Sequence, residues 1–177
     1  MKELYAVVTG ASRGLGLAFA KEFAKRNINV ILISLPGEGL EGTCRYLSNH
    51  YSIRAEYYET DLTCKDNLMS LANRINNNYN IHYLINNAGM GGTKRFDEAS
   101  PAYLDSIIQL NITATSLLTH QLLSNLKRQE KAYVLNVSSL AAFSPIGYKT
   151  VYPASKAFVH SFSRGLYQEL RDSNVFV

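Results

Sequence analysis

The chain has 177 residues, which is the length of one domain, and 46% of them are hydrophobic, enough for a sizeable core. The net charge is +4, but the lysines and arginines are scattered and form no stripe, so the charge does not favour nucleic-acid binding. No apolar stretch approaches the roughly 18 residues of a membrane span. No signal peptide precedes the first expected strand, and we therefore expect a cytoplasmic protein without a membrane partner.

Apolar runs alternate with amphipathic segments along the whole chain. Strands are expected near 4–9, 29–34, 54–59, 82–86 and 132–138. Helices are expected near 15–26, 39–50, 65–78, 103–128 and 153–172. This alternation predicts an α/β fold with a doubly wound parallel sheet of the Rossmann type, in a single domain over 1–177.

A glycine-rich turn, Thr9 to Gly16, joins the first expected strand to the first expected helix. Gly10 permits a tight turn, Gly14 lets the backbone approach a phosphate, and Gly16 lets the helix pack closely on the sheet. The positive end of the helix then faces an anion. The alternative is an ordinary glycine-rich loop, but the order of strand, turn and helix favours a dinucleotide site.

Two asparagine-containing segments are weaker signals. Asn86-Asn87-Ala88-Gly89 ends the strand expected near 82–86, and simple turn chemistry explains such a segment equally well. Asn111 lies inside the long segment 103–128, where an asparagine is mildly unfavourable and often faces solvent. Each of these two segments indicates a functional site only in combination with the other motifs.

Tyr152 and Lys156 are four residues apart and therefore share one face of a helix. A nearby ammonium favours the phenolate and brings the tyrosine pKa down from about 10 toward the range of a general acid or base. Ser139 lies thirteen residues before Tyr152, and its hydroxyl could hold a substrate oxygen. The cysteines and histidines show no metal-ligand spacing, so we expect no metal site and expect Cys44 and Cys64 to be reduced, part-buried thiols.

Together these motifs resemble the short-chain dehydrogenase/reductase family, over all 177 residues. The spacing of the three glycines resembles that of the compact members. The family's segments occur in order at Thr9 to Gly16, Asp61-Leu62, Asn86 to Gly89, Asn111, Asn136 to Ser139 and Tyr152 to Lys156.

The resemblance implies four catalytic residues. Tyr152 would exchange a proton with the substrate oxygen while hydride passes between a nicotinamide and the carbonyl carbon. Lys156 would lower the tyrosine pKa and hold the nicotinamide ribose, and Asn111 would support a water chain from Lys156. Ser139 would hydrogen-bond the substrate oxygen, with Ser138 as the competing candidate that the family's serine-to-tyrosine interval disfavours.

The resemblance also implies a cofactor site. Ser12, Arg13 and Leu15 would line the phosphate and ribose region, Asp61 and Leu62 would flank the adenine, and Asn87 would approach the adenosine ribose. The whole expected set is Gly10, Ser12, Arg13, Gly14, Leu15, Gly16, Asp61, Leu62, Asn87, Ala88, Gly89, Tyr152 and Lys156.

The choice between NADP and NAD depends on the residues after the second strand. An acidic residue there would bind a free 2′-hydroxyl, whereas an arginine would favour a 2′-phosphate. The chain reads Ser34-Leu35-Pro36-Gly37, which carries neither charge. Arg13 resembles the basic residue that NADP-using members often carry, although a solvated loop charge is the alternative. NADP is therefore favoured and NAD remains possible.

The chain ends on Val175-Phe176-Val177, which reads as the beginning of a sixth strand. Family members continue beyond this point, so we expect a truncated form of a longer enzyme without the region that covers the substrate. The resemblance implies a carbonyl or alcohol substrate, and a possible homodimer through the helices near 103–128 and 153–172. The alternative is a non-catalytic nucleotide-binding or regulatory protein, or an inactive fragment.

Overall fold

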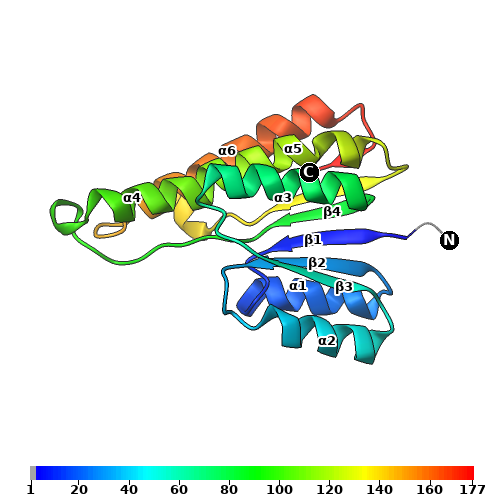
Figure 1. The fold of residues 1–177 in the computed structure, drawn as a ribbon. Helices are drawn as coiled ribbons and strands as arrows, with labels where there is room; N and C mark the ends of the chain where they lie inside the picture. The colour runs from blue at the N-terminus through cyan, green and yellow to red at the C-terminus, as the bar shows by residue number, and fades with distance from the viewer. Residues whose placement is uncertain (1–2) are drawn as a thin grey trace.

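The computed structural model describes residues 3–177, which form a six-stranded parallel sheet with helices on both faces (Figure 1). The strands are β1 (Tyr5–Thr9), β2 (Asn29–Ser34), β3 (Ala55–Glu59), β4 (Ile81–Asn86), β5 (Ala132–Asn136) and β6 (Val175–Phe176). The α-helices are α1 (Gly14–Lys25), α2 (Leu40–Tyr51), α3 (Lys65–Asn78), α4 (Pro101–Ile108), α5 (Thr115–Lys127) and α6 (Val151–Leu170).

The strand order is β3-β2-β1-β4-β5-β6, and every neighbouring pair is parallel. The order reverses between β1 and β4, which is where the connecting segments leave the sheet in opposite directions. This arrangement confirms the predicted doubly wound α/β fold. The predicted sixth strand is also confirmed, because Val175 and Phe176 pair with Ala132 and Tyr133 of β5.

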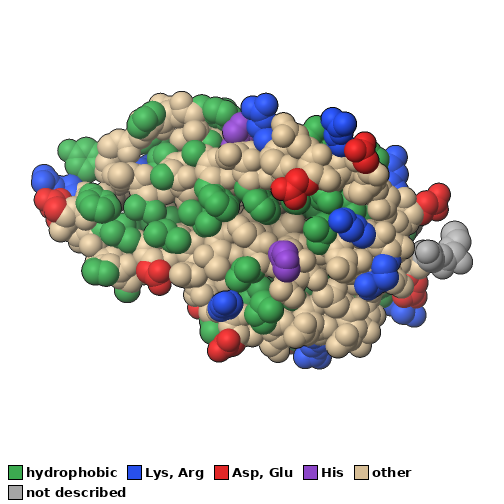
Figure 2. Space-filling view, turned by 90° about the horizontal axis from the view of Figure 1, so that it is seen from above, with side chains coloured by type: hydrophobic (Ala, Val, Ile, Leu, Met, Phe, Trp, Pro, Cys, Tyr) green, Lys and Arg blue, Asp and Glu red, His purple; other side chains and the backbone are tan. Residues whose placement is uncertain are grey.

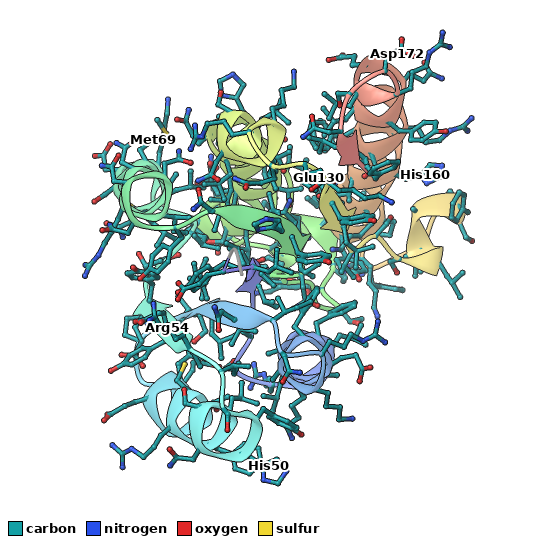
Figure 3. All side chains as sticks on the ribbon, turned by 90° about the vertical axis from the view of Figure 1, so that its right-hand side faces the viewer. His50, Arg54, Met69, Glu130, His160 and Asp172 are labelled. Atoms are coloured by element: carbon teal, nitrogen blue, oxygen red, sulfur yellow. The ribbon has the colours of Figure 1, made fainter. Side chains whose placement is uncertain are left out.

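The helices form two layers. Helices α1 and α2 lie on one side of the sheet, and α3, α5 and α6 lie on the other (Figures 1 and 3). The core is correspondingly divided into two clusters, each built from alternate residues of the same strands. In β1, for example, Val7 belongs to the cluster under α3 and α5, whereas Val8 belongs to the cluster under α1 and α2.

An aromatic stripe crosses the α1 side of the sheet. Phe23 of α1 contacts Tyr83, which stacks on Tyr133, which in turn stacks on Phe176, with ring centroids 4.9, 5.3 and 5.4 Å apart. This face is partly open over β5 and β6, since Leu135 is 41% exposed and Phe176 is 46% exposed. We call the four rings of Phe23, Tyr83, Tyr133 and Phe176, together with the neighbouring side chain of Leu135, the aromatic stripe.

The long helix predicted near 103–128 is interrupted. It begins at Pro101 with Ser100 as its N-cap, and a π-helical turn, η2 (Gln109–Ala114), separates α4 from α5. Two short 3-10 turns, η1 (Phe96–Glu98) and η3 (Leu140–Phe143), were also not predicted. The other predicted elements agree with the structure to within two residues at each end.

The face formed by α3, α5 and α6 carries many hydrophobic side chains, gathered toward the α4 end of the molecule (Figure 2). Ile108, next to η2, is 40% exposed, and Phe158 of α6 is 38% exposed and stacks on Phe162. Over residues 3–177, the chain contains no helix with the length and apolar character needed to cross a membrane.

Candidate functional site

A crevice opens where the strand order reverses, at the carboxyl ends of β1, β2 and β4. Its volume is about 510 Å³. Most of the expected cofactor residues line this crevice, namely Gly10, Ser12, Arg13, Asp61, Leu62, Asn87, Ala88 and Gly89. Segments far apart in the sequence thus meet where ligands bind in open α/β sheets.

The glycine turn forms the floor of the crevice. Gly10 has φ +64°, and a Cβ there would lie 2.9 Å from Ala88 Cα. A Cβ at Gly16 would lie 2.1 Å from the Gly10 carbonyl oxygen, so only glycine lets α1 pack against this turn. Gly14 has φ +56° and open space around it, which leaves room for a ligand to approach the backbone.

Helix α1 begins at Gly14 without a side-chain cap and without an acidic residue in its first turn. The N–H groups of the first turn have no partner within the helix and give this end a partial positive charge. An uncapped helix end that opens on a crevice is suited to phosphate groups. The turn and the helix end therefore fit the pyrophosphate of a dinucleotide.

Thr9 and Asn87 tie the ends of β1 and β4 together. The Thr9 hydroxyl oxygen accepts hydrogen bonds from the backbone N–H groups of Asn87 and Ala88, at 3.0 and 2.9 Å. The Asn87 side-chain amide donates to the carbonyls of Thr9 and Gly10, at 2.9 and 3.1 Å. Asn87 thus fixes the glycine turn as well as lining the crevice, a role that the sequence did not indicate.

Asp61 and Leu62 lie on the opposite wall, after β3. Asp61 accepts hydrogen bonds from the backbone N–H and the hydroxyl of Thr63, both at 2.8 Å, which fixes the turn before α3. Leu62 is buried, and it contributes an apolar surface to the crevice. This combination suits the flat, largely apolar face of an adenine ring.

The structure places one further charged residue in the crevice that the sequence analysis missed. Glu38 lines the crevice beside Arg13 and Ser34, and its carboxylate accepts a 2.6 Å hydrogen bond from the Ser12 hydroxyl. Glu38 follows directly after the segment Ser34 to Gly37, which carries no charge. The sequence signal for it is the Pro36-Gly37 pair, which marks a turn directly before Glu38, and in the structure Gly37 has φ +79°.

A second cavity, of about 430 Å³, adjoins the first and shares Gly89 and Met90 with it. Tyr152 and Lys156 of α6 both line this cavity, together with Leu15 and Ser138. The Tyr152 ring packs directly on Gly91, where a Cβ would lie 2.5 Å from the ring. The helical spacing of Tyr152 and Lys156 therefore brings both side chains to one cavity next to the glycine turn.

Lys156 is 6% exposed, and its Nζ donates a 2.8 Å hydrogen bond to the Val137 carbonyl oxygen. Burial lowers the pKa of this amine from its ordinary value, because the charged form loses hydration. Gly89 permits the close approach of the chain here, since a Cβ would lie 3.2 Å from both Lys156 Nζ and Asn111 Oδ1.

The two candidate serines have different partners. Ser138 donates its hydroxyl hydrogen to the Lys156 carbonyl of α6 at 2.8 Å. Ser139 caps η3, and its hydroxyl oxygen accepts from the Ala141 N–H at 3.1 Å, which leaves its hydrogen free to donate. This difference favours Ser139 as the group that holds a substrate oxygen, although Ser138, and not Ser139, lines the 430 Å³ cavity.

Asn111 lies in the π-helical turn and is 1% exposed. Its side chain pairs with both backbone groups of Met90, accepting from the N–H at 2.9 Å and donating to the carbonyl at 2.8 Å. It also donates to the Ser155 hydroxyl at 2.9 Å, and Ser155 donates to the Tyr152 carbonyl at 2.7 Å. Asn111 thus connects the loop after β4 with the first turn of α6, which carries Tyr152.

The adjacent face of the same α6 turn borders an apolar hollow of about 500 Å³. Its lining includes Phe143, Pro145 and Ile146 from the loop before α6, with Pro153 and Ala157 from the helix. No group of three or more potential metal ligands occurs within residues 3–177, and both cysteines are free, with Cys44 buried and Cys64 exposed.

Comparison with known proteins agrees with this geometry. The sequence profile of the short chain dehydrogenase family matches residues 4–177. A hydroxysteroid dehydrogenase-like protein 1 from Gallus gallus is 34% identical over 98% of this chain and 53% of its own length. A very-long-chain 3-oxoacyl-CoA reductase from Anas platyrhynchos is 32% identical, over 98% and 57%. A Danio rerio relative that is 34% identical, over 98% and 55%, is named as an inactive hydroxysteroid dehydrogenase-like protein 1. The chain thus spans about half the length of these curated relatives.

Solved structures share the fold. A bulky-bulky ketone specific alcohol dehydrogenase from Comamonas testosteroni superposes with a TM-score of 0.92 and 30% identity, over 98% of this chain and 69% of that chain. A short-chain dehydrogenase from Sphingobium yanoikuyae, solved in complex with NADPH, has a TM-score of 0.92 and 29% identity, over 98% and 68%.

Proposed function

Because the chain belongs to the short-chain dehydrogenase family, we propose that it is the cofactor-binding and catalytic part of an oxidoreductase acting on a carbonyl or secondary alcohol. The observation that carries this proposal is the junction of the two cavities at Gly89 and Met90. One cavity has the glycine turn as its floor, and the other contains Tyr152 and the buried Lys156. A dinucleotide lying along both would bring its reactive end to the tyrosine.

The residues would have the following roles in catalysis. A bound nicotinamide supplies or accepts the hydride. Tyr152 gives its hydroxyl proton to the carbonyl oxygen in reduction and takes it back in oxidation. Lys156 holds the nicotinamide ribose, Ser139 donates a hydrogen bond to the substrate oxygen, and Asn111 holds the surrounding loop and supports a water chain from Lys156.

NADP is the proposed cofactor, with NAD as the alternative. β2 ends on Ser34 and not on an acidic residue, and Arg13 lies exposed on the rim of the crevice, where it can pair with a 2′-phosphate. The complex of the Sphingobium relative with NADPH supports the same choice.

The proposed substrate is a bulky apolar carbonyl compound, or the corresponding alcohol. The apolar hollow beside α6 supports this class, because it offers Phe143, Pro145 and Ile146 next to the turn that carries Tyr152. The names of two relatives, a very-long-chain 3-oxoacyl-CoA reductase and a bulky-bulky ketone specific alcohol dehydrogenase, support the same substrate class.

The test is turnover by the protein with NADPH or NADH and a panel of 3-oxoacyl thioesters, ketosteroids and bulky ketones. We expect Tyr152→Phe to lower kcat by at least about a hundredfold, because the proton donor is lost, while the dissociation constant for the cofactor changes little. A Tyr152→Phe variant with unchanged kcat would contradict the assignment. Tyr148→Phe is a matched control, since Tyr148 is 60% exposed on the neighbouring loop.

The second candidate is a nucleotide-binding protein without turnover. It is favoured by the relatives that are named inactive. Cofactor binding in calorimetry without oxidation or reduction of any substrate in the panel would support this alternative.

We also propose a homodimer through the helical segment near 103–128, which comprises α4, η2 and α5, and through α6. The support is the exposed apolar surface at Ile108 of α4 and Phe158 of α6. Sedimentation of the wild type and of Phe158→Lys would distinguish a dimer from a monomer.

A further inference from the structure

Two loops meet beside the cavity that contains Tyr152, and each loop contributes a lysine. Lys94 belongs to the loop between β4 and η1, and Lys149 belongs to the loop between η3 and α6. The Lys94 N–H donates a 2.6 Å hydrogen bond to the Tyr148 carbonyl oxygen, which joins the two loops. Tyr148 has φ +63°, a conformation that residues other than glycine rarely adopt, and such backbone strain is concentrated at functional sites.

Lys149 lines two adjoining spaces. One is the cavity of about 430 Å³ that also contains Tyr152 and Lys156. The other is a narrow pocket of about 20 Å³, which Lys94, Lys149 and Tyr152 line together. The narrow pocket has room for about one water molecule, so only the larger cavity can hold a substrate group. Lys149 thus lies on the wall of the reaction cavity, three residues before the proposed proton donor.

The charge around these spaces is one-sided. In the part of the chain that the structure describes, their linings contain three lysines and no aspartate or glutamate. The carboxylates of Asp97 and Glu98 both pair with Arg95, at 3.0 and 3.5 Å. Within residues 3–177, neither Lys94 nor Lys149 forms an ion pair. Helix α6 adds a partial positive charge, because its N-terminus has no side-chain cap and no acidic residue in its first turn.

We propose that the substrate carries an oxyanion, such as a carboxylate, a few bonds from its carbonyl, and that Lys149 binds this group. An ammonium on the wall of a partly enclosed cavity makes strong, charge-assisted hydrogen bonds with an oxyanion. Because Lys149 and Tyr152 line the same cavity, the anion and the reacting carbonyl must lie close together in the substrate. The phosphates of coenzyme A do not meet this requirement, since a long arm separates them from the acyl carbonyl.

This inference rests on the proposed function, because it assumes that Tyr152 exchanges a proton with a carbonyl in this cavity. It narrows the substrate class, since the apolar part of the substrate must be accompanied by a negative charge. The test compares 4-oxo-4-phenylbutanoate with its methyl ester, which share the phenyl ketone and differ in charge. The quantity measured is the ratio of kcat/KM for the acid to kcat/KM for the ester, with NADPH as the reductant.

We expect the wild type to prefer the acid and Lys149→Gln to lower the ratio about tenfold, as the loss of one charge-assisted contact implies. Lys149→Arg keeps the positive charge and must retain most of the preference. Lys127→Gln is the matched control, because Lys127 is an exposed lysine in the last turn of α5 and lines neither space.

A second pair of substrates distinguishes a near anion from a distant one. The pair is 3-oxododecanoyl-CoA and the N-acetylcysteamine thioester of the same acyl chain, which lacks the phosphates. We expect Lys149→Gln to change the ratio of kcat/KM for this pair much less than the ratio for the acid and the ester. A fall confined to the coenzyme A pair would place the anion far from the carbonyl and contradict the inference.

Three further results would overturn the inference and leave the proposed function intact. They are an unchanged acid-to-ester ratio in Lys149→Gln, an equal fall in Lys127→Gln or in Lys149→Arg, and a wild type that reduces the ester or other ketones but does not prefer the acid. Absence of turnover by the wild type on every carbonyl compound, with NADPH and with NADH, would overturn the proposed function and the inference with it.

Discussion

Lys156 carries a charge although it is almost completely buried, and this burial of a charge lowers the free energy of unfolding. Its ammonium has one described hydrogen bond, to the Val137 carbonyl, and burial lowers its pKa below the ordinary 10.5. Since the folded state binds this proton more weakly than the unfolded chain, unfolding takes up protons. The contribution of Lys156 to the free energy of unfolding therefore becomes more favourable as the pH rises from the folded-state pKa to 10.5.

Replacing Lys156 by Met tests this linkage. We expect the free energy of unfolding of the wild type to increase relative to that of Lys156→Met as the pH is raised toward 10.5. The reason is that the buried charge is then lost in the wild type. Urea titrations at a series of pH values measure the difference. Taking the difference cancels the titration of the tyrosines and cysteines that both proteins share. A difference that does not vary with pH would show that the amine is effectively hydrated in the folded state.

At the scale of elements, the first turn of α1 depends on a glycine that has no room for a side chain. Ala at position 16 would place a methyl group 2.1 Å from the Gly10 carbonyl oxygen and displace α1 from the glycine turn. We expect Gly16→Ala to lower the free energy of unfolding by about 1–3 kcal/mol and to weaken cofactor binding.

Gly42→Ala is the control for Gly16→Ala. Gly42 also lies in a helix, α2, but a Cβ there meets nothing within 4 Å. We expect this change to raise the free energy of unfolding by up to about 1 kcal/mol, since alanine loses less conformational entropy than glycine in a helix. Urea unfolding of both variants measures the two opposite effects. Equal losses of stability in both variants would refute the close-packing argument for Gly16.

Hydrophobic periodicity predicted most of the elements, because alternation of strand and helix leaves a strong signal in the core positions of β1, β2 and β4. It did not predict the π-helical turn at Gln109–Ala114. A single widened turn inside a long apolar segment has no composition signal of its own, although it contains Asn111. Glu38 was missed for a different reason: its place in the crevice depends on how the loop after β2 folds back, and periodicity says nothing about loops.

At the scale of the whole molecule, the aromatic stripe leaves apolar surface on the α1 side of β5 and β6. Leu135 is 41% exposed there, whereas its neighbour Val134 faces the opposite layer and is 3% exposed. We expect Leu135→Thr to reduce the binding of a hydrophobic dye and to change the free energy of unfolding by no more than about 0.5 kcal/mol.

Val134→Thr is the matched control for Leu135→Thr, in the same strand and with the same new residue. It buries a hydroxyl in the core and should lower the free energy of unfolding by about 1–3 kcal/mol. Dye fluorescence and urea unfolding give the two readouts. Equal destabilisation by both substitutions would mean that the Leu135 side of β5 is covered in solution.

The parallel strand order also determines how much of the chain must be synthesised before the crevice can form. Strand β1 pairs with β4, and Tyr5 can therefore pair with Ile81 only after the intervening β2, β3 and three helices have been synthesised. Closing such a loop is entropically expensive, and topologies dominated by distant pairings fold slowly. Because Thr9 is joined to Asn87 and Ala88 only when this pairing is complete, a nascent chain shorter than about ninety residues cannot form the pocket floor. Dinucleotide added during synthesis can then stabilise only the late, nearly native intermediates.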